Sequence, residues 1–78
     1  MNRNDIENTL LKVLSAVLKR EFSPGTALDR SSINEWDSLK HVEIMFAVED
    51  EFSVSFTEEE LAELDNVERI VNAVLNKA

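Results

Sequence analysis

The sequence contains no cysteine, and glycine and proline occur once each among its 78 residues. Without cysteine the chain has no disulfide, no thiolate metal site and no cysteine nucleophile, so thiol chemistry would need a borrowed cofactor. The scarcity of glycine and proline disfavours a turn-rich β-sandwich, collagen and low-complexity sequence, whereas abundant Ala, Leu, Glu, Lys and Arg favour helices joined by short connections. The length admits one small domain, over residues 1–78.

Long apolar runs are also missing. None approaches the roughly 18 residues that a membrane span needs. The first residues carry neither the basic start nor the apolar stretch of a signal peptide. We therefore expect a soluble, cytoplasmic protein without a membrane span.

Basic residues are few, because eight Lys and Arg stand against sixteen Asp and Glu, a net charge of −8. The imbalance lies in residues 34–65, which hold eleven acidic residues and one basic residue, Lys40, a net charge of −10. Residues 1–33 and 66–78 carry +1 each. This distribution excludes nucleic-acid binding through phosphate neutralisation and predicts a partner with a basic surface. A merely solvated acidic face is the alternative.

Apolar periodicity predicts an all-α fold, a small four-helix bundle of three main helices and one short helix. The first helix is expected over about residues 5–20, with Asn4 and Glu7 as a capping box at its start. Residues 22–37 contain Pro24 and Gly25 and show no sustained period, so they are expected to form a long loop between the first two helices. The residues expected to anchor this loop are Phe22, Leu28 and Ile33.

The remaining helices follow from periodicity and capping signals. The second helix is expected over residues 38–52 and the short helix up to about Leu64. The last helix follows with a regular apolar stripe. The capping boxes expected before these last two helices are Thr57 with Glu60 and Asp65 with Glu68.

The predicted second helix has apolar residues on two faces, although a helix in a two-layer bundle needs only one buried stripe. At about 100° per residue, the second group lies roughly 100° or more away from the core stripe. The core stripe comprises Ile44, Met45, Val48 and Phe52, and the outer group comprises Leu39, Val42 and Phe46 with Glu43, Glu49 and Asp50 around them. An apolar group with an acidic rim predicts a docking surface for an apolar spot ringed by Lys or Arg. The alternative is a helix covered by the loop or by the short helix and buried all round.

Asp37, Ser38 and Leu39 stand at the start of the second helix. A polar residue at this position usually only caps the helix. A phosphate ester on a serine in the first turn would also meet unpaired backbone N–H groups and the positive end of the helix dipole. Together with the long loop and the acidic helix, the segment 37–44 resembles the acyl carrier protein family, whose signature is Asp-Ser-Leu followed three residues on by an apolar residue and Glu. The resemblance covers almost the whole chain.

This resemblance implies that Ser38 carries 4'-phosphopantetheine, transferred from coenzyme A by a separate Mg²⁺-dependent phosphopantetheinyl transferase. The terminal thiol of the arm would hold an acyl group as a thioester, and Asp37 would cap the helix and help present Ser38. The resemblance also implies a non-enzymatic carrier, which we expect to be a monomer. It would deliver intermediates of fatty-acid, polyketide or related biosynthesis to acyl-loading and acyl-processing enzymes with basic docking patches. The residues expected to dock are Leu39, Val42, Glu43, Phe46, Glu49 and Asp50.

The residues before the motif depart from the usual family pattern. Carriers of fatty-acid synthesis usually place Gly and a small residue before Asp-Ser-Leu, whereas this chain has Glu35 and Trp36. Trp-Asp-Ser-Leu is more similar to stand-alone carriers of specialised pathways, and an aminoacyl or peptidyl carrier on the same fold is the alternative. Trp36 would lie either at the entrance for cargo or in the core as a plug of the loop. Likewise, the core stripe would line either a cargo cavity or an ordinary core.

Other classes of function fit the residues poorly. A hydrolase built on Ser38 and His41 is excluded, because the chain has a single His and no Gly-x-Ser-x-Gly turn. No metal site is expected, since a calcium loop starting at Asp29 would have Ile33 at a ligand position and Asn34 in place of the turn glycine. An unmodified acidic helical adaptor is the rival from a different class. It would keep the docking face but would need no modifiable serine.

Overall fold

The structure is a computed structural model, which describes residues 2–22 and 28–77; the predicted turn residues Pro24 and Gly25 lie outside the described residues. The described part contains four α-helices and one 3₁₀ turn. They are α1 (Arg3–Leu18), η1 (Arg30–Ser32), α2 (Ser38–Phe52), α3 (Glu58–Glu63) and α4 (Val67–Lys77). The prediction of an all-α bundle with three main helices and one short helix is confirmed.

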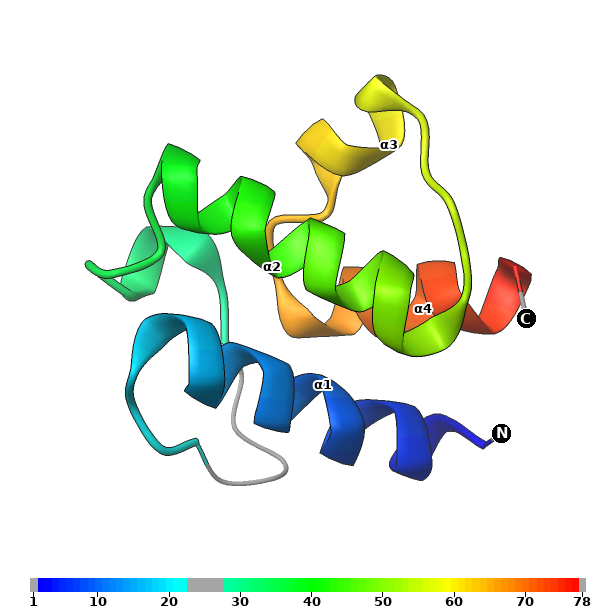
Figure 1. Cartoon of the computed structure of the whole chain (residues 1–78), viewed down its shortest axis with the longest axis horizontal. Coiled ribbons are helices and arrows are strands. Elements are labelled where there is room, and N and C mark those ends of the chain that lie inside the picture. The colour runs from blue at the N-terminus through cyan, green and yellow to red at the C-terminus, as the bar shows by residue number, and fades with distance from the viewer. Residues whose placement is uncertain (1, 23–27, 78) are drawn as a thin grey trace.

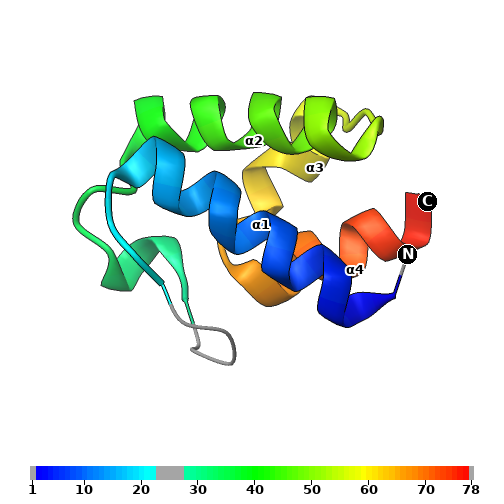
Figure 2. The ribbon, with the colours of Figure 1, turned by 60° about the horizontal axis from the view of Figure 1, so that its bottom comes forward.

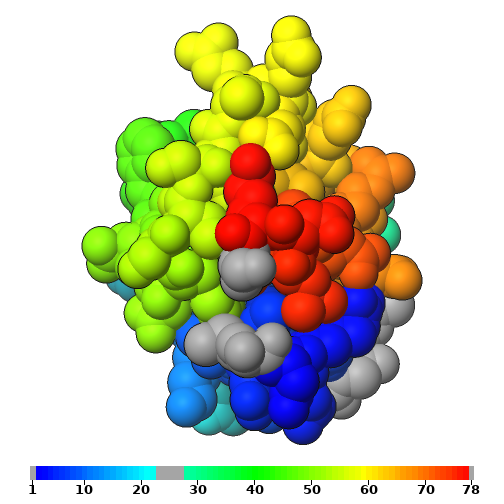
Figure 3. All heavy atoms as spheres, turned by 90° about the vertical axis from the view of Figure 1, so that its right-hand side faces the viewer, coloured from blue at the N-terminus to red at the C-terminus, as the bar shows by residue number. Residues whose placement is uncertain are grey.

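The three long helices pack around one core. α1 and α2 run side by side in opposite directions, and α4 packs against α1, while α3 lies to one side, in the connection from α2 to α4 (Figures 1 and 2). The last turns of α4 lie against the beginning of α1, and α3 stands out from the body beside them (Figure 3). At this contact the Arg3 guanidinium donates a hydrogen bond to the side chain of Asn72. No helix within the described ranges is long and apolar enough to cross a bilayer.

The core is a single cluster of aliphatic side chains with one tryptophan. Fully buried members include Ile6, Leu10 and Leu14 from α1, Ile44 and Val48 from α2, and Ile70 and Val74 from α4. Each such side chain contributes about 1.5–3 kcal/mol of transfer free energy. The predicted apolar stripes of these helices therefore face one another in the structure, and their burial holds the three long helices together.

The first helix begins and ends earlier than periodicity predicted. Its N-cap is Asn2, whose side chain accepts a hydrogen bond from the backbone N–H of Asp5 at 2.8 Å. The predicted capping box of Asn4 and Glu7 is therefore wrong, because both residues lie within the helix. The helix ends before Lys19, which is left-handed with φ of 57°. Periodicity misplaced the start because two asparagines, two residues apart, both offer a capping side chain.

The long connection between α1 and α2 carries more structure than a plain loop. Leu28 and Ile33 are buried in the core, as predicted, and Phe22 is partly buried against it. Between the two buried residues, Asp29 forms an isolated antiparallel bridge with Asn66. The backbone N–H of Arg30, the first residue of η1, donates to the Asp65 carbonyl at 2.8 Å. The connection is thus fastened to the segment before α4, which sequence periodicity did not indicate.

The last two helices have well-defined caps, of which one was predicted correctly. Thr57 and Glu60 form the expected capping box, with reciprocal backbone bonds of 2.9 and 3.2 Å. Before α4, however, Asn66 accepts from the backbone N–H of Arg69 at 2.7 Å, so the predicted cap of Asp65 with Glu68 is wrong. Asp65 instead accepts from the Arg69 guanidinium at 3.1 Å. The side-chain oxygen of Asn66 is the group that caps α4, because it accepts from the third backbone N–H of that helix.

Candidate functional site

The candidate site is the amino end of α2. Asp37 is extended, and its carboxylate accepts from the backbone N–H of Lys40 at 2.9 Å, so the predicted helix cap is confirmed. The Asp37 carbonyl accepts from the His41 N–H at 2.8 Å, which closes the first turn. Ser38 is therefore the first residue of the helix, and it is exposed. Its hydroxyl lies beside the unpaired N–H groups and the positive dipole of the helix end, as predicted.

Arg30 reaches this serine from η1. Its Nη2 donates a hydrogen bond to Ser38 Oγ at 2.8 Å. The turn that carries Arg30 is held by Asp29, which accepts from the Ser31 hydroxyl at 2.6 Å and from the Ser32 N–H at 3.0 Å. These bonds, with the side chain of Ser31 contributing most, hold the pKa of Asp29 below its ordinary value. Sequence reasoning missed Arg30, because eight positions of irregular chain separate it from Ser38.

A buried polar network lies beneath the first turn of α2. Trp36 and His41 are 2% and 7% exposed, and the indole Nε1–H donates to His41 Nδ1 at 3.0 Å. Because an indole N–H is only a donor, Nδ1 is the acceptor and the ring hydrogen lies on Nε2. His41 Nε2 then donates to the Leu61 carbonyl of α3 at 2.8 Å. The network ties the residue before the Asp-Ser-Leu motif to both α2 and α3.

The same network decides where Trp36 lies, which the sequence left open. Trp36 is part of the core, so it plugs the connection instead of standing open at the surface. His41 uses both ring nitrogens on Trp36 and Leu61, and Ser38 is bonded to Arg30. The geometry therefore agrees with the exclusion of a Ser–His hydrolase. Within residues 2–22 and 28–77, no cluster of three or more His, Asp or Glu could hold a metal ion.

The outer face of α2 is exposed, as predicted. Leu39, Val42 and Phe46 are 68%, 47% and 63% exposed, which rules out the alternative of a helix buried all round. Glu43 and Asp50 are exposed around this group, and Lys40 Nζ lies 3.4 Å from the Glu43 carboxylate. We call the surface formed by Leu39, Val42, Glu43, Phe46 and Asp50 the outer face of α2. Within the described ranges these three are the large apolar side chains that are exposed, and they form an apolar patch beside acidic residues.

Glu49 was predicted to belong to the same acidic rim, but its side chain forms a hydrogen bond with the connection between α2 and α3. Its carboxylate accepts from the backbone N–H of Phe56 at 2.8 Å and is partly buried. The Glu49 carbonyl also accepts from Val54, and Ser53 ends the helix with φ of 55°. Glu49 therefore holds the connection between α2 and α3, in addition to lying beside the outer face.

Comparison with known proteins places this geometry in a family. The family model described as "Phosphopantetheine attachment site" matches residues 8–74. The chain belongs to this family of carrier proteins. A curated relative, the acyl carrier protein of Buchnera aphidicola subsp. Schizaphis graminum, is 28% identical over 78 residues, and the match covers 95% of each chain. No solved structure matches the chain significantly.

Membership confirms the resemblance noted in the sequence and identifies 4'-phosphopantetheine as the cofactor of the carrier. The amino end of α2 fits such a group. It offers an exposed hydroxyl as an attachment point, unpaired helix N–H groups, and a guanidinium already in contact with that hydroxyl. A phosphate joined to Ser38 would meet cationic and N–H donors there and would need no displacement of core residues.

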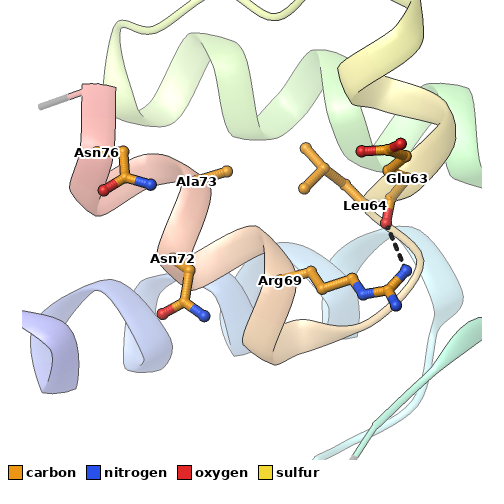
Figure 4. Close-up of a pocket in the computed structure, with 6 residues that line it drawn as sticks. All are labelled: Glu63, Leu64, Arg69, Asn72, Ala73 and Asn76. Atoms are coloured by element: carbon orange, nitrogen blue, oxygen red, sulfur yellow. Dashed lines mark hydrogen bonds between the residues drawn. The ribbon is translucent and has the colours of Figure 1, made fainter.

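The core side of α2 is buried within the main cluster of the carrier. Ile44, Met45 and Val48 are at most 1% exposed, and Phe52 packs partly buried beside them. The pocket drawn in Figure 4 lies elsewhere, between α3 and α4, and none of these residues lines it. Polar and apolar side chains both line it, and Arg69 Nη1 donates there to the Glu63 carbonyl at 3.2 Å. The residues that line it are Glu63, Leu64, Arg69, Asn72, Ala73 and Asn76.

Proposed function

We propose that Ser38 is the residue that carries the 4'-phosphopantetheine arm, and that the protein shuttles acyl groups between the enzymes of a biosynthetic pathway. The chief support is the exposed Ser38 hydroxyl at the first position of α2, within the segment matched by the phosphopantetheine attachment family. When attached, the arm supplies a terminal thiol that holds an acyl group as a thioester. The chain itself has no cysteine for this purpose.

The role of the chain in attachment is to present the hydroxyl. Attachment would join Ser38 Oγ to phosphorus and break the pyrophosphate bond of coenzyme A. Adenosine 3',5'-bisphosphate would leave, and a base of the transferase would take the hydroxyl proton. Asp37 holds the first turn of α2 in shape through its bond to the Lys40 N–H, so that Ser38 stays at the surface. Catalysis belongs to the transferase, and this chain acts as its substrate.

The outer face of α2 is proposed to dock the partner enzymes. Exposed Leu39, Val42 and Phe46 would fill an apolar spot on the partner, and Glu43 and Asp50 would meet its basic rim. The phosphopantetheinyl transferase and the acyl-loading and acyl-processing enzymes would use this same surface, because it adjoins Ser38. Glu49 would contribute charge at the edge while its carboxylate holds Phe56.

The proposed cargo is an acyl intermediate of fatty-acid, polyketide or related biosynthesis. An aminoacyl or peptidyl cargo is the alternative and would use the same serine, arm and fold. The family match favours a carrier over an unmodified adaptor. A monomeric state and a cytoplasmic location stay predictions.

Intact-mass analysis tests the proposal. The purified chain is incubated with coenzyme A, Mg²⁺ and a broad-specificity phosphopantetheinyl transferase, and we expect its mass to rise by one phosphopantetheine group. Ser38→Ala should stay folded and gain nothing, whereas Ser55→Ala, a matched control at another exposed serine, should be modified like the wild type. Modification of any other serine, or none with an active transferase, would refute the proposal.

A further inference from the structure

We propose that Arg30 is a phosphate-binding residue of the carrier, which holds the phosphodiester that joins the arm to Ser38. The inference rests on the proposed function of Ser38 and adds a residue outside the Asp-Ser-Leu motif. It begins from the 2.8 Å hydrogen bond between Arg30 Nη2 and Ser38 Oγ. This is a contact between a cation and a neutral hydroxyl, at the position where an anion is expected.

Arg30 has no acidic partner within the described residues. The ion pairs found there occupy Arg3, Arg20, Lys40, Arg69 and Lys77. Its neighbour Asp29 does not pair with it and instead accepts from Ser31 and Ser32. In a chain with a net charge of −8, a guanidinium directed at a serine hydroxyl instead of a carboxylate indicates a site for an anion that is added later.

The backbone of Arg30 is held in place independently of its side chain. Its N–H donates to the Asp65 carbonyl at 2.8 Å, and Asp29 before it bridges Asn66. The residue is partly buried, and it belongs to a 3₁₀ turn capped by the Asp29 carboxylate. Arg30 is therefore presented from a turn that is fastened to the segment before α4, so little side-chain movement is needed to keep its contact with the amino end of α2.

Attachment of the arm would move the hydrogen bond of Arg30 from Ser38 Oγ to the oxygens of the new phosphate. Esterification turns Ser38 Oγ into an ester oxygen, which is a weak acceptor. It also places anionic oxygens next to Oγ, on the phosphorus to which Oγ is joined. Arg30 would keep its position and redirect Nη2 and its second terminal nitrogen to those oxygens, because a planar guanidinium can donate to two phosphate oxygens at once. Lys could offer only a point charge there.

Local electrostatics favour a cation beside Ser38. The segment 34–65 carries a net charge of −10, and the Asp37 carboxylate lies directly before Ser38. A further anion at this position is repelled by that field. The helix end offsets only part of the repulsion, because its dipole acts weakly on exposed charges. Lys40, the other nearby cation, is engaged with Glu43, so Arg30 is the cation that touches Ser38.

A thermal-melting cycle tests this inference. The unmodified (apo) and modified (holo) forms of wild type, Arg30→Gln and Arg30→Lys are compared at low salt, after intact mass has confirmed the state of each sample. We expect the holo-minus-apo difference in melting temperature to be lower in Arg30→Gln than in wild type by about 4 °C, since the charge-assisted bonds are lost. Arg30→Lys should restore part of the difference. At about 1 M salt, where the screening length is about 3 Å, the gap should shrink.

Arg20→Gln is the matched control. It removes the same charge from an arginine that pairs with Glu35 at 3.1 Å and does not contact Ser38. Its holo-minus-apo difference should equal that of wild type. A merely structural role for Arg30 predicts another result, because Arg30→Gln would then lower the melting temperatures of the apo and holo forms equally.

Nuclear magnetic resonance supplies a second measurement on the same samples. In the holo wild type, the phosphorus resonance should differ in shift from that of holo Arg30→Gln. The guanidinium N–H signals of Arg30 should sharpen on modification, because rotation of a bound guanidinium is hindered. Equal apo and holo losses together with unchanged phosphorus shifts would overturn the role of Arg30 and leave the proposed function intact. If the wild type gains no mass, the proposed function fails, and the role of Arg30 falls with it.

Discussion

The hydrogen bond between Trp36 and His41 should be a measurable part of the stability of the domain. We consider two substitutions, Trp36→Phe and His41→Leu, each of which removes one hydrogen-bonding partner and leaves an apolar side chain in its place. Trp36→Phe leaves His41 Nδ1 buried without its donor, and His41→Leu leaves the indole N–H buried without its acceptor. The Leu61 carbonyl keeps one bond in the second case, because it also accepts from the Leu64 N–H at 3.3 Å.

The magnitude follows from the burial of the pair. Trp36 is 2% exposed and His41 7%, so water does not replace the lost partner. A buried polar group left unsatisfied costs about 1–3 kcal/mol, and each single substitution should therefore lower the free energy of unfolding by about 2 kcal/mol. The double substitution leaves neither group unpaired, so its loss should be smaller than the sum by about 1–2 kcal/mol. A domain of this size has about 4–12 kcal/mol in total, so all three variants should fold.

Urea unfolding followed by far-UV circular dichroism measures these losses, and it does not depend on the fluorescence of Trp36. With a slope of about 1–2 kcal/mol/M, each single substitution should lower the midpoint by about 1–2 M. The coupling is read from the double-mutant cycle. If the loss in the double variant equals the sum of the two single losses within about 0.5 kcal/mol, the two side chains do not stabilise the fold through their hydrogen bond.

Three further predictions concern charge. Reversal of Glu43 and Asp50 to Lys should slow phosphopantetheine transfer onto the apo carrier, measured by intact mass over time, and should make the transfer rate less sensitive to added salt. Glu68→Lys on α4 is the control and should leave the transfer rate unchanged. Equal rates in both variants would place docking elsewhere. The lowered pKa of Asp29 means that its contribution to stability is complete above its ordinary value of 3.8 and is lost as the pH falls through the lower folded value. Asp29→Asn, which can still accept from Ser31 and Ser32, should therefore flatten the fall of melting temperature below about pH 4, and an unchanged slope would contradict this assignment. Because residues 34–65 carry a net charge of −10, added salt or millimolar divalent cation should raise the melting temperature at neutral pH, and indifference to both would mean that these charges are already neutralised.

Features that depend on near neighbours in the chain could be predicted from the sequence. The bounds of α2, 38–52, follow from the Asp37 cap and the apolar spacing, and the Thr57–Glu60 capping box follows from a spacing of three residues. The exposure of the outer face of α2 followed from its angular separation from the core stripe. The misplaced caps, Asn2 for Asn4 and Asn66 for Asp65, arose where two capping residues lie close together.

Features that depend on how the irregular connections return to the helices could not be predicted. Glu49 was expected to lie only in the docking rim, yet it holds the Phe56 N–H seven positions away. His41 was considered only as a catalytic residue, although it is buried between Trp36 and α3. The one available signal was its position, four residues before the buried Met45 on the same helix, where a polar ring needs partners inside the fold.

The places of the helices, the serine that begins α2 and the face of that helix that meets solvent follow from local signals, because capping and amphipathic spacing act over three or four residues. The side chains that meet around that serine depend instead on how the folded chain closes on itself. Arg30 reaches Ser38 because the Asp65 carbonyl, thirty-five positions along the chain, holds the backbone of its turn. Trp36 lies under α2 because its indole N–H donates to His41 and its rings pack in the core cluster. Such contacts depend on how an irregular segment closes on distant parts of the chain, and no local spacing encodes that closure.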